Sequence, residues 1–307
     1  MKKILSVLQA PAVRAGFMLL AVIAAIWAIV ANREAVGEAL AALPWWVSLA
    51  GIALSLVYVA CTMVSWRYLL NDVGQPVPAR VARRIFYTSQ VAKYLPGGVW
   101  NFVAAAEMGA AHSIARRRSF VALLLSMVVS IVTGLVLAVL ALLLGPAGLM
   151  EDYGWLALAI PVGVVALIPP VLNRIISLGL KILGRGALEA QLSWRGTGLA
   201  ALWAAVGWLL MGAQLWLMLI YQGMAASLPT FLLATGGYAL GWTVGFLVFF
   251  VPAGVGVREL ALAAVLSTAV GSGPVVVVVL LSRVFTTLAD VSLGLLAGIA
   301  ARRAARR

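Results

Sequence analysis

Residues 119–144 read SFVALLLSMVVSIVTGLVLAVLALLL, a run of 26 residues without a charged side chain. As an α-helix this run would be about 39 Å long, which exceeds the roughly 30 Å hydrocarbon core of a bilayer. A helix also satisfies its own backbone hydrogen bonds, as a segment in lipid must do. The run therefore predicts a transmembrane helix.

The rest of the chain has the same character. Of its 307 residues, 64% are hydrophobic and 10% are charged, whereas soluble domains are about half apolar and about a quarter charged. A soluble fold of this size could not cover so much apolar surface. We therefore predict an all-α, polytopic membrane helix bundle in which residues 1–307 form a single integral membrane domain. About eight transmembrane helices are expected, at 15–31, 45–64, 119–144, 154–172, 198–221, 230–250, 257–272 and 274–299.

The charged residues orient this bundle. Lysine and arginine exceed aspartate and glutamate by 13, and they gather in the connections 65–118 and 173–197 and in the tail, whereas the intervening connections are acidic or uncharged. Cytoplasmic loops carry the excess of basic residues, so we expect both termini in the cytoplasm and an even number of crossings. The short seventh segment, 257–272, is kept for that reason. Basic loops of this kind indicate anionic lipid rather than nucleic acid as the partner.

The sequence offers little material for catalysis. Cys61 and His112 are the single cysteine and histidine, too few for a thiolate metal cluster or an intramolecular disulfide. We find no metal-ligand spacing, catalytic triad, phosphate-binding loop or paired carboxylates. We therefore expect no metal, no cofactor and no enzymatic activity.

A first break in the helical pattern reads KYLPGGVWN at 93–101. Pro96, Gly97 and Gly98 cannot sit in a continuous helix, yet the flanking pieces, about 81–94 and 99–111, are too apolar for a solvated loop. A re-entrant hairpin that dips into the membrane fits both facts, since irregular backbone is tolerated there when protein buries it. The alternative is an interfacial amphipathic helix followed by a plain turn.

A second break reads FVPAGVGVRE at 250–259, where Pro252, Gly254 and Gly256 interrupt the chain. The helix that begins after it would present unpaired N–H groups, which favour a phosphate. Arg258 could add a charge-assisted contact. Glu259 could simply cap the new helix, and the whole segment could instead be a cytoplasmic turn.

The last predicted helix carries charges near the middle of the membrane. Arg283 and Asp290 lie seven residues apart on one helix face, together with Thr286 and Thr287. Charges at that depth are costly and need partners. Two interpretations stay open: the face lines a substrate pathway, or Arg283 and Asp290 form a purely structural pair.

Two patterns concern the arrangement of the helices. Pro96 and Pro252 lie 156 positions apart in similar local sequences, so the halves 1–150 and 151–307 could form a two-fold internal repeat, as in some transporters. Gly237, Gly241 and Gly245 repeat every four residues, which indicates close contact with a neighbouring helix.

Taken together, KYLPGGVW at 93–100, PAGVGVRE at 252–259 and Ser282-Arg283 resemble the lysylphosphatidylglycerol synthetase/flippase transmembrane-domain family over nearly the whole chain. Ala253 departs from a glycine common in the second motif, and the soluble aminoacyl-transferring domain of bifunctional members is absent, so we expect this chain not to make lysyl-lipid. The resemblance implies a helix bundle with re-entrant segments in a bacterial inner membrane that moves a phospholipid between leaflets. The residues expected to bind the headgroup are Lys93, Tyr94, Pro96, Gly97, Gly98, Trp100, Asn101, Arg258, Glu259, Arg283 and Asp290.

Three functions remain to be distinguished. A lipid translocase needs buried charges that face one cavity. A lipid-modifying enzyme needs a general base there, for which Glu107, Glu259 and Asp290 are the candidates. A non-catalytic subunit, partnering an enzyme of lipid or glycolipid synthesis, predicts charges that pair with each other and leave no open groove.

Overall fold

The computed structural model describes residues 33–94, 100–144, 158–182, 184, 188, 190–248, 256–267 and 269–305. Within these ranges the regular structure is entirely helical. In chain order the elements are α3 (Arg33–Ala41), α4 (Trp45–Asp72), α5 (Ala79–Val91), the short 3₁₀ helix η1 (Ala92–Tyr94), α6 (Trp100–Ala110), α7 (Arg116–Leu144), α9 (Ala159–Ala166), α10 (Pro169–Ile182), α11 (Trp194–Ile220), α12 (Leu228–Leu247), α13 (Val257–Leu266) and α14 (Ser272–Ala305).

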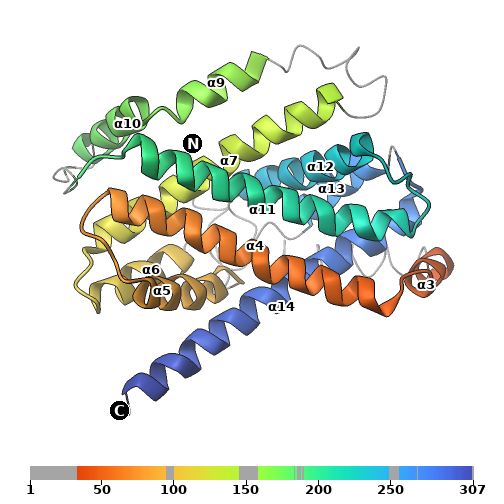
Figure 1. The fold of residues 1–307 in the computed structure, drawn as a ribbon, viewed down its shortest axis with the longest axis horizontal. Helices are drawn as coiled ribbons and strands as arrows, with labels where there is room; N and C mark the ends of the chain where they lie inside the picture. Colours follow the sequence, from red (N-terminus) through yellow and green to blue (C-terminus); the bar gives the residue numbers. More distant parts are fainter. Residues whose placement is uncertain are drawn as a thin grey trace, which may run out of the picture.

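Five long helices form the body of the protein. The helices α4, α7, α11 and α12, together with residues Gly273–Arg303 of α14, are long and apolar enough to cross a membrane. The helix α4 packs along α11 and α7 packs along α12, and all five run lengthwise through the molecule (Figure 1). The transmembrane helices predicted at 45–64, 119–144, 198–221, 230–250 and 274–299 are thus confirmed as candidate membrane spans.

The crossing predicted at 154–172 is wrong as a continuous helix. The helix α9 ends at Ala166, and α10 begins at Pro169 with its axis bent by 64°. Pro169 and Pro170 explain the bend, because proline lacks the amide hydrogen that continues a helix and is well placed in a first turn. The pair α9 and α10 counts as one span only if a sharply bent helix pair can cross the membrane.

The predicted count of eight is not confirmed. The described residues contain five candidate spans, or six with the bent pair. The segment predicted as a crossing at 257–272 forms α13, whose ten residues extend only about 15 Å, half of the hydrocarbon thickness. The helix predicted at 15–31 lies outside the described residues.

A pair of short helices lies where the first break is predicted. The helix α5 ends at Val91 and α6 begins at Trp100, and the two pack against each other (Figure 1). With 13 and 11 residues, each is shorter than about 20 Å and cannot span a bilayer alone. On α5 the buried side chains of Ile85 and Phe86 face the bundle, whereas Arg83 and Arg84 are exposed.

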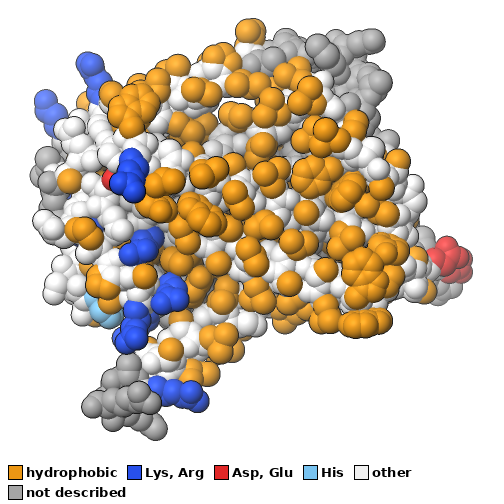
Figure 2. Space-filling model, in the orientation of Figure 1, with side chains coloured by type: hydrophobic (Ala, Val, Ile, Leu, Met, Phe, Trp, Pro, Cys, Tyr) orange, Lys and Arg blue, Asp and Glu red, His pale blue; other side chains and the backbone are white. Residues whose placement is uncertain are grey.

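Apolar and charged side chains occupy different parts of the surface along the length of the molecule. A broad apolar belt covers the middle of the molecule, and lysine and arginine side chains gather at the end where α5, α6 and the C-terminal part of α14 lie (Figures 1 and 2). Acidic side chains mark the opposite end, beside α3, which contains Glu34 and Glu38. An apolar belt between charged ends is the surface that a lipid bilayer requires.

Buried polar contacts fix how the long helices meet. The side chain of Gln214 donates to the backbone carbonyl of Gly51 (2.7 Å) and to the hydroxyl of Ser55 (2.6 Å), and accepts from the hydroxyl of Ser282 (2.7 Å). These bonds join α4, α11 and α14 at a fully buried point. They hold α14, which carries two of the predicted site residues, against its neighbours.

Candidate functional site

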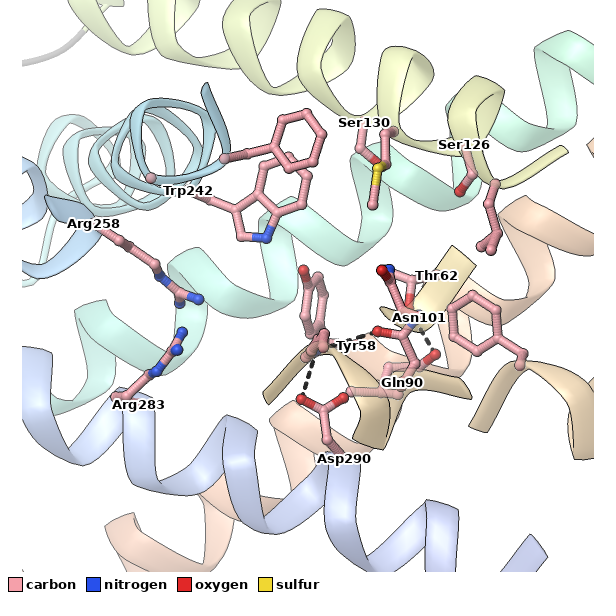
Figure 3. Close-up of a pocket in the computed structure, with 17 residues that line it drawn as sticks. Tyr58, Thr62, Gln90, Asn101, Ser126, Ser130, Trp242, Arg258, Arg283 and Asp290 are labelled. Atoms are coloured by element: carbon pink, nitrogen blue, oxygen red, sulfur yellow. Dashed lines mark hydrogen bonds and ion pairs between the residues drawn. The ribbon is translucent and has the colours of Figure 1, made fainter. Parts of the chain in front are cut away.

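One cavity of about 180 Å³ lies between the long and the short helices (Figure 3). This central cavity is lined from α4, α5, α6, α7, α12, α13, α14 and η1. Five predicted site residues meet there although they come from four separate parts of the chain: Lys93, Asn101, Arg258, Arg283 and Asp290.

The tightest contact in the central cavity joins Lys93 to Asp290. The lysine Nζ lies 2.7 Å from Oδ2 of Asp290, whose side chain is 3% exposed, while that of Lys93 is 31% exposed. The same Nζ donates to Oε1 of Gln90 at 3.2 Å. This ion pair ties the C-terminal end of α5 and η1 to α14.

Tyr94 strengthens that tie. Its hydroxyl donates to Oδ2 of Asp290 at 2.7 Å. Burial and the neighbouring Asp290 carboxylate raise the pKa of Tyr94, so the phenol stays neutral and remains a donor at physiological pH. Asp290 therefore accepts from two donors on η1, and its oxygen Oδ2 is fully engaged.

The two arginines of the central cavity point toward one another (Figure 3). The guanidinium carbon of Arg258 lies 4.6 Å from the ring centroid of Tyr238, and that of Arg283 lies 6.0 Å from the ring centroid of Tyr94. Aromatic faces stabilise cations at such distances. A ring that contacts the flat face of a guanidinium group does not block hydrogen bonds at its N–H edges.

Glu259 acts mainly on its own helix. Its Oε2 accepts from the backbone N–H of Gly256 at 2.6 Å, which satisfies a donor in the first turn of α13. The other oxygen, Oε1, lies 3.7 Å from Nε of Arg283, beyond hydrogen-bond distance. The predicted capping role of Glu259 is confirmed, and its charge is shared with Arg283.

The structural pair of Arg283 with Asp290, one of the two interpretations left open by the sequence, does not form. Each side chain instead meets a residue from another element, Glu259 on α13 and Lys93 on η1. Thr286 and Thr287 bond carbonyls of their own helix. Two turns separate the charges along α14, and the short helices supply closer partners.

The glycine repeat of α12 positions α13. A methyl group added at Gly245 would lie 2.7 Å from Cβ of Arg258, and one added at Gly241 would lie 3.1 Å from the Arg258 carbonyl oxygen. At Gly237 it would meet Val265 at 3.1 Å. The predicted close helix contact is confirmed, and its consequence is that Arg258 reaches the central cavity.

Other predicted site residues lie elsewhere. Trp100 begins α6 and is 45% exposed, outside the cavity lining. Gly256 has a positive φ of 86° at the start of α13, a conformation that favours glycine. The remaining predicted residues lie outside the described ranges: Pro96, Gly97, Gly98, Pro252 and Gly254.

Several lining residues were not predicted. Tyr58, Trp242 and Phe246 form an aromatic wall, and polar side chains occupy another part of the lining: Thr62, Gln90, Ser126 and Ser130. Serine and aromatic residues are ordinary members of membrane helices, so their sequence gives no signal. Gln90 alone had a sequence signal, because it is a polar residue three positions before Lys93.

The family comparison bears directly on this site. The family model described as the lysylphosphatidylglycerol synthase TM region matches residues 15–294, which include all the charged residues of the central cavity. The chain belongs to this family. It is an integral membrane protein, and its family indicates a role in lipid metabolism or transport. No curated protein matched the chain.

Proposed function

We propose that this protein is a lipid translocase that moves a phospholipid or lipid-linked headgroup between the leaflets of a bacterial inner membrane. The observation that carries the proposal is the pair of guanidinium groups, Arg258 and Arg283, facing each other in the central cavity (Figure 3). Arginine binds phosphate oxygens by charge-assisted, often bidentate hydrogen bonds. Charged side chains buried among membrane helices typically line a pathway for a charged substrate.

The size of the central cavity supports a headgroup as its occupant. Pockets that enclose a drug-sized ligand are about 300–1,000 Å³, whereas this cavity is about 180 Å³. It could hold a phosphate with a small headgroup, while the acyl chains stay in the surrounding lipid. The short helices α5, α6 and α13 contribute the polar side chains of Gln90, Asn101 and Arg258 to its lining.

The direction of insertion belongs to the same proposal. The cationic end of the molecule, near α5 and the end of α14 (Figure 2), would face the cytoplasm according to the positive-inside rule. The C-terminal end of α14 would then be cytoplasmic, and the crossing predicted at 15–31 would place the N-terminus on the same side.

A second candidate function is a non-catalytic membrane subunit that supports an enzyme of lipid or cell-envelope glycolipid synthesis. The observation that favours it is the pairing of charges between elements, Lys93 with Asp290 and Arg283 with Glu259. The central cavity favours the translocase, because a structural charge network needs no open space. An enzyme is disfavoured, since Asp290 and Glu259 each use one carboxylate oxygen for a hydrogen bond and each lies beside a cation, and Glu107 lies on the surface.

Movement of lipid between leaflets in proteoliposomes tests the proposal. Acyl-labelled fluorescent phosphatidylglycerol and phosphatidylethanolamine would be followed by quenching of the outer leaflet. Removing a hydrogen bond to a charged group costs about 1.5–3 kcal/mol, so Arg258→Gln and Arg283→Gln should each slow movement about 10- to 100-fold. Arg302→Gln, an exposed arginine near the end of α14, is the matched control and should retain the wild-type rate.

Two outcomes would count against the translocase. If the wild type moves no lipid faster than empty liposomes do, the subunit function becomes the better one, and a partner enzyme should be sought by co-purification. If both cavity variants, still monodisperse on gel filtration, move lipid at the wild-type rate, the central cavity is not the route.

A further inference from the structure

The lining of the central cavity is divided into two chemically different ends. Arg258 and Arg283 occupy one end, and Asn101, Ser126 and Ser130 lie away from them, beyond Tyr58 (Figure 3). An anion at the first end would leave any attached group beside the second. The nature of the second end therefore selects the headgroup.

Three polar side chains at the second end have unused hydrogen-bonding capacity. Asn101 is 5% exposed and Ser126 is 9% exposed, yet the side chains of Asn101, Ser126 and Ser130 form no hydrogen bond with any other residue of the described part of the chain. Buried polar groups are nearly always hydrogen-bonded. Groups of this kind that line a cavity are expected to bind water or a ligand.

Two rings of the aromatic wall, those of Tyr58 and Trp242, lie between the two ends (Figure 3). The ring of Trp242 stacks on Phe246 with centroids 5.5 Å apart and packs edgewise on Trp208 at 5.3 Å, so its orientation is fixed. The π face of an aromatic ring is electron-rich, and it can pack against the C–H face of a polyol or against a cation.

The net positive charge of the cavity lining disfavours a cationic headgroup. Three cations, Lys93, Arg258 and Arg283, line the central cavity with one carboxylate, that of Asp290, whose Oδ2 Lys93 and Tyr94 engage. When Glu259, which lies beside Arg283, is counted as well, the cations still exceed the carboxylates by one. An ammonium group in the headgroup would meet an excess of positive charge.

Resting on the proposed translocase function, we propose that the preferred headgroup is an anionic phosphate ester carrying several hydroxyl groups, a polyol or sugar phosphate without an amino group. The arginines bind its phosphate, Trp242 packs against its carbon skeleton, and Asn101, Ser126 and Ser130 bond its hydroxyls. Because different side chains bind the phosphate and the hydroxyl groups, variants can separate phosphate binding from hydroxyl recognition.

Binding of dioctanoyl lipids to the purified full-length protein in detergent tests this separation. The probes are phosphatidylinositol, phosphatidic acid and phosphatidylethanolamine, with free inositol 1-phosphate as the tail-less form. Each hydrogen bond contributes about two- to tenfold in affinity, so phosphatidylinositol should bind about tenfold or more tightly than phosphatidic acid. Phosphatidylethanolamine should bind most weakly.

Variants assign that preference to the cavity. The double variant Ser126→Ala, Ser130→Ala should lose most of the preference for phosphatidylinositol and keep its affinity for phosphatidic acid. Arg258→Gln should weaken both lipids alike. Ser177→Ala, an exposed serine on α10, is the control and should change neither.

Equal binding of phosphatidylinositol and phosphatidic acid would overturn the inference, since the hydroxyl end would then hold only water. Tighter binding of phosphatidylethanolamine would overturn it in favour of an ammonium headgroup. If the selectivity holds but no lipid changes leaflet in proteoliposomes, the headgroup class stands and translocation fails. If inositol 1-phosphate binds as tightly as the lipid, the ligand is a soluble polyol phosphate and the lipid substrate fails.

Discussion

The ion pair between Lys93 and Asp290 allows a quantitative test of how the site is held together. Lys93→Met removes the cation at nearly constant volume, and Asp290→Asn removes the negative charge but keeps an oxygen that can accept from Tyr94. The two single variants and the double variant form a cycle that isolates the energy of the pair.

The expected magnitudes follow from burial. Breaking one side of a buried pair costs about 3–5 kcal/mol. In Lys93→Met the nearly inaccessible Asp290 retains its bond from Tyr94, so we expect a loss of about 2–3 kcal/mol. In Asp290→Asn the remaining Lys93, 31% exposed, reaches water, and a loss of about 1–2 kcal/mol is expected. The double variant should cost less than the sum by about 1–2 kcal/mol.

Unfolding of the purified protein in detergent measures these differences, with a lowering of Tm by about 5 °C for Lys93→Met. The surface pair of Arg116 with Glu107 has the same 2.7 Å separation but is more than half exposed, and serves as the matched control with a smaller coupling. Additive losses at Lys93 and Asp290, or a coupling no larger than at the surface pair, would refute the reasoning.

Three further outcomes are expected. Gly245→Ala places a methyl group 2.7 Å from Cβ of Arg258, so it should lower the stability by about 1–3 kcal/mol and weaken the binding of phosphate lipids. Gly179→Ala, with open space around it, is the control and should be neutral or stabilising in thermal unfolding. Equal effects of the two variants would contradict the helix contact. Gln214→Leu should lower stability by about 1–3 kcal/mol because its bonds join α4, α11 and α14, and an unchanged Tm would argue against that link. The single variants Gly37→Cys and Arg303→Cys should react with an impermeant maleimide from opposite sides of the membrane. Labelling of both variants from the same side would contradict the orientation.

The long helices could be predicted from the sequence because burial in lipid demands about 20 apolar residues at a stretch. The runs around α4, α7, α11, α12 and α14 carry that signal without ambiguity. The same criterion failed at 154–172, where apolar character outweighed the two prolines that begin α10. It also failed at 257–272, where the parity of crossings argued for a span and the chain formed a short helix.

The charged members of the site were visible in the sequence for a related reason. A charge inside an apolar run is conspicuous, which identified Arg283 and Asp290, whereas Lys93 and Arg258 were found through the two Pro/Gly breaks and the family motifs. Their pairing was not predictable, because the sequence does not say which helices are neighbours. Arg283 and Asp290 lie on one face of α14, but each contacts a residue of a short helix instead of the other. The internal repeat stays a prediction.

The serine and aromatic residues of the lining do not differ from the apolar sequence around them as the charged residues do. Ser126 and Ser130 lie in the same run of 26 residues that fixes the transmembrane character of α7. Serine in a membrane helix can bond its own backbone, so its presence alone indicates nothing. Only the position of these side chains opposite Arg258 and Arg283, across the central cavity, gives them a role.

Chemical modification within the central cavity tests most directly whether lipid headgroups pass through it. Cys61, the single cysteine, is buried, so Ser130→Cys in a Cys61→Ala background gives one reactive thiol in the lining. Treatment with a negatively charged methanethiosulfonate should abolish lipid movement in proteoliposomes, and phosphatidylglycerol should slow the labelling. The same reagent on Gly37→Cys, an exposed position on α3, should leave the rate unchanged. Full labelling at residue 130 with lipid movement still at the unmodified rate would contradict a route through the cavity.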